Sequence, residues 1–166
     1  VDNRALTFDP QAARVELTRI FRSHGEAAAV ARPFVLEYLA ALLKAAHAEA
    51  RERLDRDGNG RACAESLARF QDALIELTHD YTVAHVYYAS DPVSDALAVV
   101  ATGGYGRGLL APGSDIDLLF LLPYKQTPWG ESVVEAMLYV LWDLGLKVGH
   151  ATRSIDQCLK LSEGDM

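Results

Sequence analysis

Two short apolar runs separated by a glycine-rich segment are the feature of this chain that most constrains its fold. The first run covers residues 96–102, and the second begins around Asp115 and ends at Leu122. Runs of this length, bounded by glycines and polar residues, are typical of buried strands. The chain is therefore expected to build a sheet, with the glycine-rich segment at one edge of it.

Gly103 and Gly104 follow the first run directly. No side chain blocks the backbone at these positions, so a phosphate can approach the amide N–H groups closely. A helix starting within residues 105–110 would favour an anion further, because its first N–H groups have no partner inside the helix. The pattern predicts a phosphate-binding turn.

Asp115 and Asp117 lie two positions apart at the start of the second run. In a strand, residues i and i+2 point to the same face, about 6.6 to 6.8 Å apart at Cα, so Ile116 points the other way. Two such carboxylates can bind Mg²⁺, which takes oxygen ligands and leaves room for substrate phosphates. Alone, such a pair is more often a polar turn entering a strand than a metal site. The glycine pair upstream changes this and favours metal-assisted chemistry on a nucleotide phosphate.

Three segments together resemble a known family. The first resemblance is to the signature of the nucleotidyltransferase superfamily. It consists of the glycine pair, a spacer of ten residues and the Asp-x-Asp motif. The longer matches, residues 103–108, 114–118 and 148–153, resemble the bacterial PII uridylyltransferase/uridylyl-removing enzymes. The matching segments cover about residues 96–166, whereas the first half of the chain carries no diagnostic motif.

The resemblance implies Mg²⁺-dependent transfer of UMP from UTP to a tyrosine of the PII nitrogen-regulatory protein, with release of pyrophosphate. Asp115 and Asp117 would be the catalytic metal ligands, and Gly103, Gly104 and Ser114 would bind the nucleotide phosphates. Arg107 would either add positive charge at the leaving phosphates or form a structural ion pair. The uridylyl-removing activity and small-molecule sensing would belong to C-terminal domains that these residues do not match.

The family pattern also implies a third carboxylate on a later strand. Gly149 stands where it would be expected, so the candidates are Asp165 and residues beyond Met166. On this interpretation the chain alone is catalytically incomplete. His150 is either a catalytic residue or one that positions its strand through a hydrogen bond.

Other interpretations of the motifs remain. The glycines fit neither a dinucleotide fingerprint nor a P-loop. An adenylylating relative, a metal-dependent nucleotide-sugar transferase, and a nucleotide-binding fragment without turnover stay open as alternatives. No residue indicates the base specificity, the acceptor surface, the oligomeric state or the regulation.

Composition excludes some classes of partner. The net charge of −7 argues against a broad nucleic-acid or anionic-membrane surface. No leader or membrane-length apolar stretch is visible, and Cys63 and Cys158 are too far apart for a Cys-x-x-Cys motif, so a cytoplasmic protein with two small buried thiols is expected. Because the chain starts at Val1, we expect a fragment.

The predicted fold class is α+β, with a helical region over residues 1–90 and a nucleotidyltransferase-type mixed-sheet core over residues 91–166, whose C-terminal end we expect to be truncated. Asp9 and Pro10 predict the start of a first helix. Apolar stripes predict a second helix from Pro33 to Leu54 and a third whose stripe runs from Leu67 to Tyr88, together an antiparallel hairpin. The turn at residues 55–60 resembles a calcium loop but has Ser66 at its twelfth position, so we interpret it as an interhelix turn.

In the second half, Thr127 and Pro128 predict the start of a helix that ends at Gly145. A strand over residues 145–151 follows. Ser154 and Gln157 form a capping box that predicts a last helix, extending through Leu161.

Overall fold

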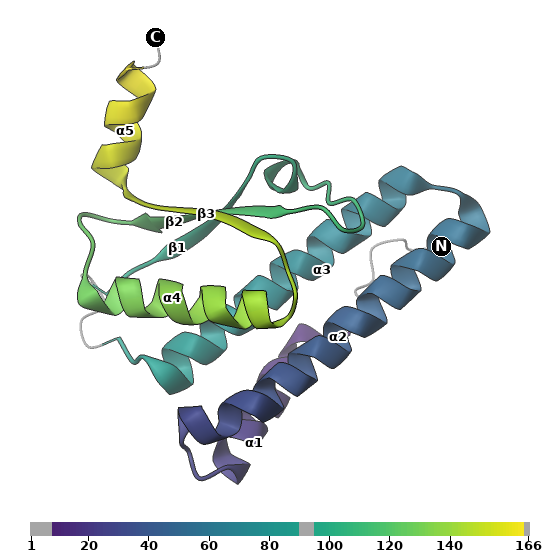
Figure 1. Cartoon of the computed structure of the whole chain (residues 1–166), viewed down its shortest axis with the longest axis horizontal. Coiled ribbons are helices and arrows are strands. Elements are labelled where there is room, and N and C mark those ends of the chain that lie inside the picture. Colours follow the sequence, from purple (N-terminus) through teal and green to yellow (C-terminus); the bar gives the residue numbers. More distant parts are fainter. Residues whose placement is uncertain (1–7, 90–94, 165–166) are drawn as a thin grey trace.

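The computed structural model describes residues 8–89 and 95–164 of the chain. Three helices come first and a small mixed sheet with two further helices follows, which confirms the predicted α+β class (Figure 1). The helices of the first half are α1 (Pro10–Ser23), α2 (Ala28–Asp57) and α3 (Gly60–Tyr81), followed by a π-helical turn η1 (Thr82–Val86). The second half contains β1 (Ala98–Thr102), a 3₁₀ turn η2 (Tyr105–Arg107), β2 (Ile116–Leu122), α4 (Pro128–Asp143), β3 (Val148–Ser154) and α5 (Ile155–Gly164).

Local signals set several helix ends as predicted. The Asp9 carboxylate accepts a hydrogen bond from the Gln11 N–H at 2.9 Å and caps α1. The Asn59 side chain caps α3 in the same way, and Gly58, in the left-handed conformation with φ 65°, ends α2. The turn at residues 55–60 is thus an interhelix turn, and its Asn59 oxygen already accepts a hydrogen bond from the Ala62 N–H.

Two helix boundaries differ from the prediction. Helix α2 begins at Ala28 and includes Pro33, because one missing N–H is tolerated where Ala31 and Val35 are buried against neighbouring helices. Helix α3 ends at Tyr81, and the π turn of η1 changes the spacing of the buried side chains after it. Thr82 is buried and Val83 and Val86 pack against the core, whereas the predicted stripe residues Ala84 and Tyr88 are exposed.

Strand order in the sheet is β1-β2-β3. Strand β1 pairs antiparallel with β2, and β2 pairs parallel with β3. The parallel pair needs a crossover, which α4 provides. Strand β3 begins at Val148, slightly later than predicted, because the chain first turns at Gly145, where φ is 78°.

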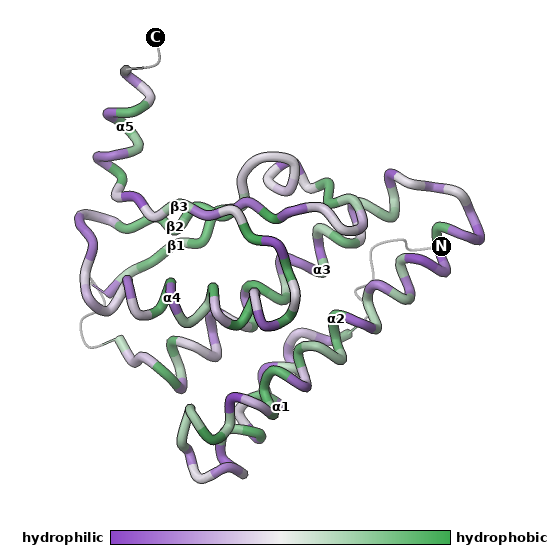
Figure 2. Tube along the Cα trace, viewed as in Figure 1, coloured by the Kyte–Doolittle hydropathy of each residue, from purple (hydrophilic) through white to green (hydrophobic). Residues whose placement is uncertain are grey.

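One face of the sheet packs on helices and the other is open in the described part of the chain. Side chains along β2 alternate between buried and more exposed, with Ile116, Leu118, Phe120 and Leu122 on the helix side. On the opposite face Val100 is 38% exposed and Asp117 is exposed. Helix α5 extends away from the body and alternates apolar and polar residues along its length (Figures 1 and 2).

Two clusters of buried side chains make up the core. One lies among α1, α2 and α3, and the other lies among α3, the sheet and α4. Helix α3 contributes to both: Leu74 belongs to the first cluster and Ile75 to the second. No helix in the described part is both long enough and apolar enough to cross a membrane.

The cysteines are both free thiols. Cys63 is buried in the core cluster of the sheet, as predicted, whereas Cys158 on α5 is only half-buried.

Candidate functional site

The glycine-rich turn folds back tightly on the end of β1. Gly103 has φ 60° and Gly108 has φ 71°, both in the left-handed region that favours glycine. A Cβ atom on Gly106 would lie 2.6 Å from the Ala101 carbonyl oxygen, so only glycine fits there. Between them η2 is a single 3₁₀ turn rather than the start of a helix. The turn therefore exposes backbone N–H groups without a helix dipole behind them.

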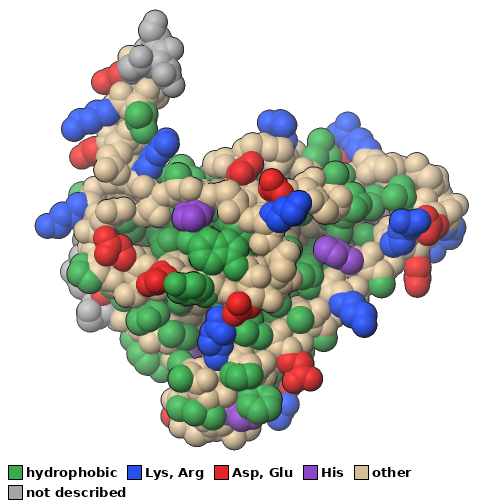
Figure 3. All heavy atoms as spheres, viewed as in Figure 1, with side chains coloured by type: hydrophobic (Ala, Val, Ile, Leu, Met, Phe, Trp, Pro, Cys, Tyr) green, Lys and Arg blue, Asp and Glu red, His purple; other side chains and the backbone are tan. Residues whose placement is uncertain are grey.

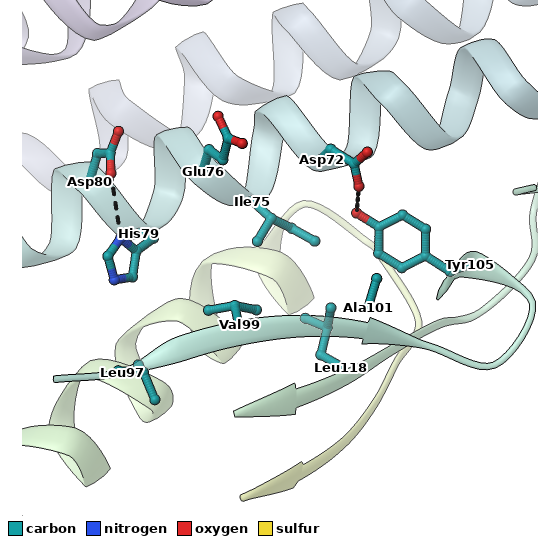
Figure 4. A pocket seen from close by; sticks show the side chains of 10 residues that line it. All are labelled: Asp72, Ile75, Glu76, His79, Asp80, Leu97, Val99, Ala101, Tyr105 and Leu118. Carbon is teal, nitrogen blue, oxygen red and sulfur yellow. Dashed lines mark hydrogen bonds and ion pairs between the residues drawn. The ribbon is translucent and has the colours of Figure 1, made fainter. Parts of the chain in front are cut away.

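A buried tyrosine fixes this turn to the helical region. Tyr105 is 4% exposed, and its hydroxyl donates a 2.6 Å hydrogen bond to Asp72 Oδ1 on α3 (Figure 4). Burial, together with the hydrogen bond to Asp72, raises the pKa of the Tyr105 hydroxyl well above its usual value. The pair borders a cavity of about 310 Å³ between α3 and β1, with Val99, Ala101 and Leu118 on the sheet side.

Asp117 lies between two glycines. In the register of the sheet it is opposite Thr102 of β1 and Gly149 of β3. A Cβ atom on Gly103 would lie 2.5 Å from Asp117 Oδ2, and a Cβ atom on Gly149 would overlap Asp117 Oδ1. The two carboxylate oxygens thus occupy the space that side chains at positions 103 and 149 would fill.

Asp115 lies one residue before β2 and is exposed, with the buried Ile116 between it and Asp117. Its Oδ1 atom is 3.9 Å from Lys147 Nζ, and both side chains are well exposed, so this contact contributes little stability. The Ile116 N–H donates to the Lys147 carbonyl oxygen at 2.9 Å, which continues the β2–β3 pairing to this point.

Lys147 lies beside Asp115, and the sequence motifs do not reveal this placement. It belongs to none of the three matching segments and lies next to the aspartates only because β3 pairs with β2. The one signal in the sequence is its place just before a strand.

The other two predicted phosphate-binding residues surround the same end of the sheet. Arg107 is exposed, and its Nη2 atom would lie 3.8 Å from a Cβ atom on Gly104, so the guanidinium reaches back over the glycine pair. Ser114 is exposed in a turn in which its N–H donates to the Ala111 carbonyl oxygen at 3.1 Å.

His150 lies on the other face of the sheet from Asp117. It pairs in register with the buried Leu118, and its ring is 6.0 Å from that of Trp142 on α4. Figure 3 shows a hydrophobic patch on this side of the molecule, and Tyr139 and Trp142 of α4 are about half exposed. This placement argues against direct contact between His150 and the aspartates.

No third carboxylate joins Asp115 and Asp117 in the part of the chain that the structure describes. No three His, Cys, Asp or Glu side chains there lie close enough to hold a metal ion. On the face of β3 that carries Gly149, the next residues are Ala151 and Arg153. Asp165 falls outside the described residues.

The arrangement nevertheless fits a magnesium ion shared with a substrate. Mg²⁺ is commonly held by one or two carboxylates together with phosphates. Asp115 and Asp117 offer hard oxygen ligands, and the glycine turn next to Asp117 offers backbone donors to a phosphate.

Comparisons with known proteins agree with this geometry. The nucleotidyltransferase domain family matches residues 90–163. A bifunctional uridylyltransferase/uridylyl-removing enzyme of Bradyrhizobium sp. (strain ORS 278) is 47% identical over 99% of this chain and 18% of its own length. Proteins of the same name from Rhodopseudomonas palustris and Bradyrhizobium diazoefficiens are 49% and 54% identical, over 96% and 81% of this chain and 17% and 15% of their own lengths.

The chain therefore spans less than a fifth of the length of the curated relatives it matches. No solved structure matches it.

Proposed function

We propose that this chain belongs to the bifunctional uridylyltransferase/uridylyl-removing enzymes, and that it serves the transfer of UMP from UTP to a tyrosine of the PII protein. The proposal is supported by about 50% identity to part of these enzymes and by the match of residues 90–163 to the nucleotidyltransferase domain family. The observation that supports the proposal is the closeness of the glycine turn to Asp117, since a Cβ atom on Gly103 would lie 2.5 Å from Asp117 Oδ2. Transfer would take place in the cytoplasm, where UTP and PII are both available.

Asp115 and Asp117 would hold Mg²⁺, which when bound neutralises charge on the triphosphate oxygens. The N–H groups of Gly103 and Gly104 and the Ser114 hydroxyl would donate hydrogen bonds to the phosphates. Arg107 and Lys147 would bring positive charge to the leaving side, one from the glycine turn and one from the start of β3.

In the proposed reaction the acceptor tyrosine oxygen attacks the α-phosphorus of UTP in line with the bond that breaks. A new phosphodiester bond forms between tyrosine and UMP, the hydroxyl proton is released, and pyrophosphate leaves. The residues of this chain would act by orienting the triphosphate for in-line attack and by stabilising its negative charge.

Product analysis tests the proposal. The full-length protein is incubated with Mg²⁺, PII and each labelled nucleoside triphosphate in turn, and label on PII is measured. We expect label from UTP alone. Label from ATP instead would indicate an adenylylating enzyme, and nucleotide binding without label on PII would indicate a domain without turnover.

Substituting the aspartates tests their role. Asp115→Asn and Asp117→Asn each remove a charged metal ligand and should lower transfer by about 10²-fold or more, as removal of a main electrostatic group does at other active sites. Asp156→Asn is the matched control, since Asp156 lies in the first turn of α5. Circular dichroism checks the fold, and full activity in either site variant would rule out a metal role for that residue.

A further inference from the structure

The two glycines beside Asp117 are there for different reasons. Gly103 has φ 60°, so its backbone alone requires glycine. Gly149 is absent from the residues with positive φ and has ordinary strand backbone that any residue adopts. Glycine is unfavourable inside a strand because it has no side chain to pack and loses more entropy on folding. The backbone therefore gives no reason for a glycine at 149.

The Asp117 carboxylate gives that reason. A Cβ atom at 149 would overlap Oδ1, and its next nearest atom would be Asp117 Cγ at 3.6 Å. On the other side Oδ2 lies 2.5 Å from where a Cβ atom on Gly103 would be. A side chain at 149 would thus displace the Asp117 carboxylate from its present position.

We propose that Gly149 is a positioning residue for the metal site: by lacking a side chain it keeps the Asp117 carboxylate flat between β1 and β3, where its oxygens can bind a divalent cation. This inference rests on the proposed function. It also explains the gap in the expected motif. A carboxylate at 149 would occupy the space that Asp117 uses, so this register position has to be free of side-chain atoms.

The direct test measures binding of Mn²⁺ alone to the full-length protein, without nucleotide, by electron paramagnetic resonance of the free ion. Residues that orient a metal ligand typically change affinity by about 10- to 100-fold when substituted, and we expect a loss of that size for Gly149→Ala. Ala151→Ser is the matched control. It adds one heavy atom on the same face of the same strand, opposite Leu119, and should leave Mn²⁺ affinity unchanged.

A second measurement separates positioning of Asp117 from a general effect on β3. Gly149→Ala is made in the wild-type protein and in Asp117→Ala, and the thermal midpoint of each is measured in a metal chelator. When residue 117 has no carboxylate, the new methyl group has space, and alanine should raise the midpoint relative to glycine. In the wild type the same change should give no such gain.

The outcomes distinguish the two proposals. If Gly149→Ala binds Mn²⁺ like the wild type, or shifts the midpoint equally in both backgrounds, the positioning role is wrong, while uridylyl transfer by the wild type still supports the proposed function. If the wild type neither binds Mn²⁺ nor transfers UMP, the proposed function is wrong and the positioning role is overturned with it.

Discussion

At the level of single residues, Tyr105 is the side chain that joins the glycine-rich turn to the helical region. It is the one member of the turn that is buried, and its hydroxyl reaches Asp72 on α3. The flanking glycines give the backbone of the turn conformational freedom, and the hydrogen bond of Tyr105 restricts it. The geometry of the glycine-rich turn thus depends on a contact with the other half of the chain.

Replacing this tyrosine should lower stability modestly. Tyr105→Phe removes the hydrogen bond but keeps the ring, and because Asp72 is exposed and can be hydrated, the loss should be about 1 kcal/mol. Urea unfolding of the 166-residue chain measures it. Tyr124→Phe is the control, since Tyr124 is 67% exposed. Equal stability of the two variants would contradict the role of the bond.

The loss of stability caused by Tyr105→Phe should also depend on pH. Because the pKa of Tyr105 is raised on folding, its contribution to stability is complete below the unfolded-state pKa of about 10 and is lost as the pH rises from there toward the folded-state value. The stability difference between wild type and Tyr105→Phe should therefore shrink above pH 10. A difference that stays constant through this range would contradict the raised pKa.

At the level of elements, α4 is the crossover that brings β3 beside β2, and its first turn is well defined. The Thr127 hydroxyl accepts a 3.0 Å hydrogen bond from the Gly130 N–H, and Pro128 follows at the first helical position. Gly130 is buried under Leu122 of β2. The cap therefore fixes where the helix begins over the sheet.

Loss of this cap should be measurable. Thr127→Ala leaves the Gly130 N–H without its partner and should cost about 1 kcal/mol, whereas Thr127→Ser keeps the hydroxyl and should cost much less. Urea unfolding of both variants makes the comparison. Equal losses would mean that the methyl group of Thr127, rather than its hydroxyl, matters.

Signals within one or two turns of sequence predicted the structure best. The caps of α1 and α4 and the capping box at Ser154 and Gln157 are confirmed, since each depends on a hydrogen bond between residues two or three apart. The strands around the glycine turn are confirmed for a similar reason, because each is a short apolar run closed by polar residues.

Features that depend on contacts between distant residues could not be predicted from the sequence. The start of α2 before Pro33 depends on packing against other helices. The register of β3 decides that Gly149, and not His150, faces Asp117, and that Lys147 lies near Asp115. A one-residue shift in register would exchange the faces of all these side chains, and alternation along a single strand does not reveal which register is formed.

At the level of the whole molecule, α3 connects the helical region to the sheet. Residues of α3 belong to both core clusters. The boundary predicted near residue 90 therefore separates two segments that both pack against this helix. We therefore expect both halves to unfold together.

A core substitution tests this cooperativity. Leu74→Ala, at a site with 0% exposure in the cluster of α1, α2 and α3, should cost about 2 to 5 kcal/mol. Far-ultraviolet circular dichroism follows the helices, and the fluorescence of Trp129 and Trp142 follows the sheet region. Both should shift to the same lower midpoint. Val15→Ala, at a 67% exposed site on α1, is the control, and separate transitions would contradict a single unit.

The strand pairing also sets the order in which the site is completed during folding. The glycine turn and both aspartates belong to one antiparallel pair of strands close in sequence, whereas Gly149 and Lys147 arrive only after the α4 crossover. Contacts between neighbouring segments close with less loss of chain entropy than distant ones, so the β1–β2 pair has the lower kinetic barrier. Asp117 thus emerges from the ribosome and can pair with β1 before the strand that holds its carboxylate in place has been synthesised.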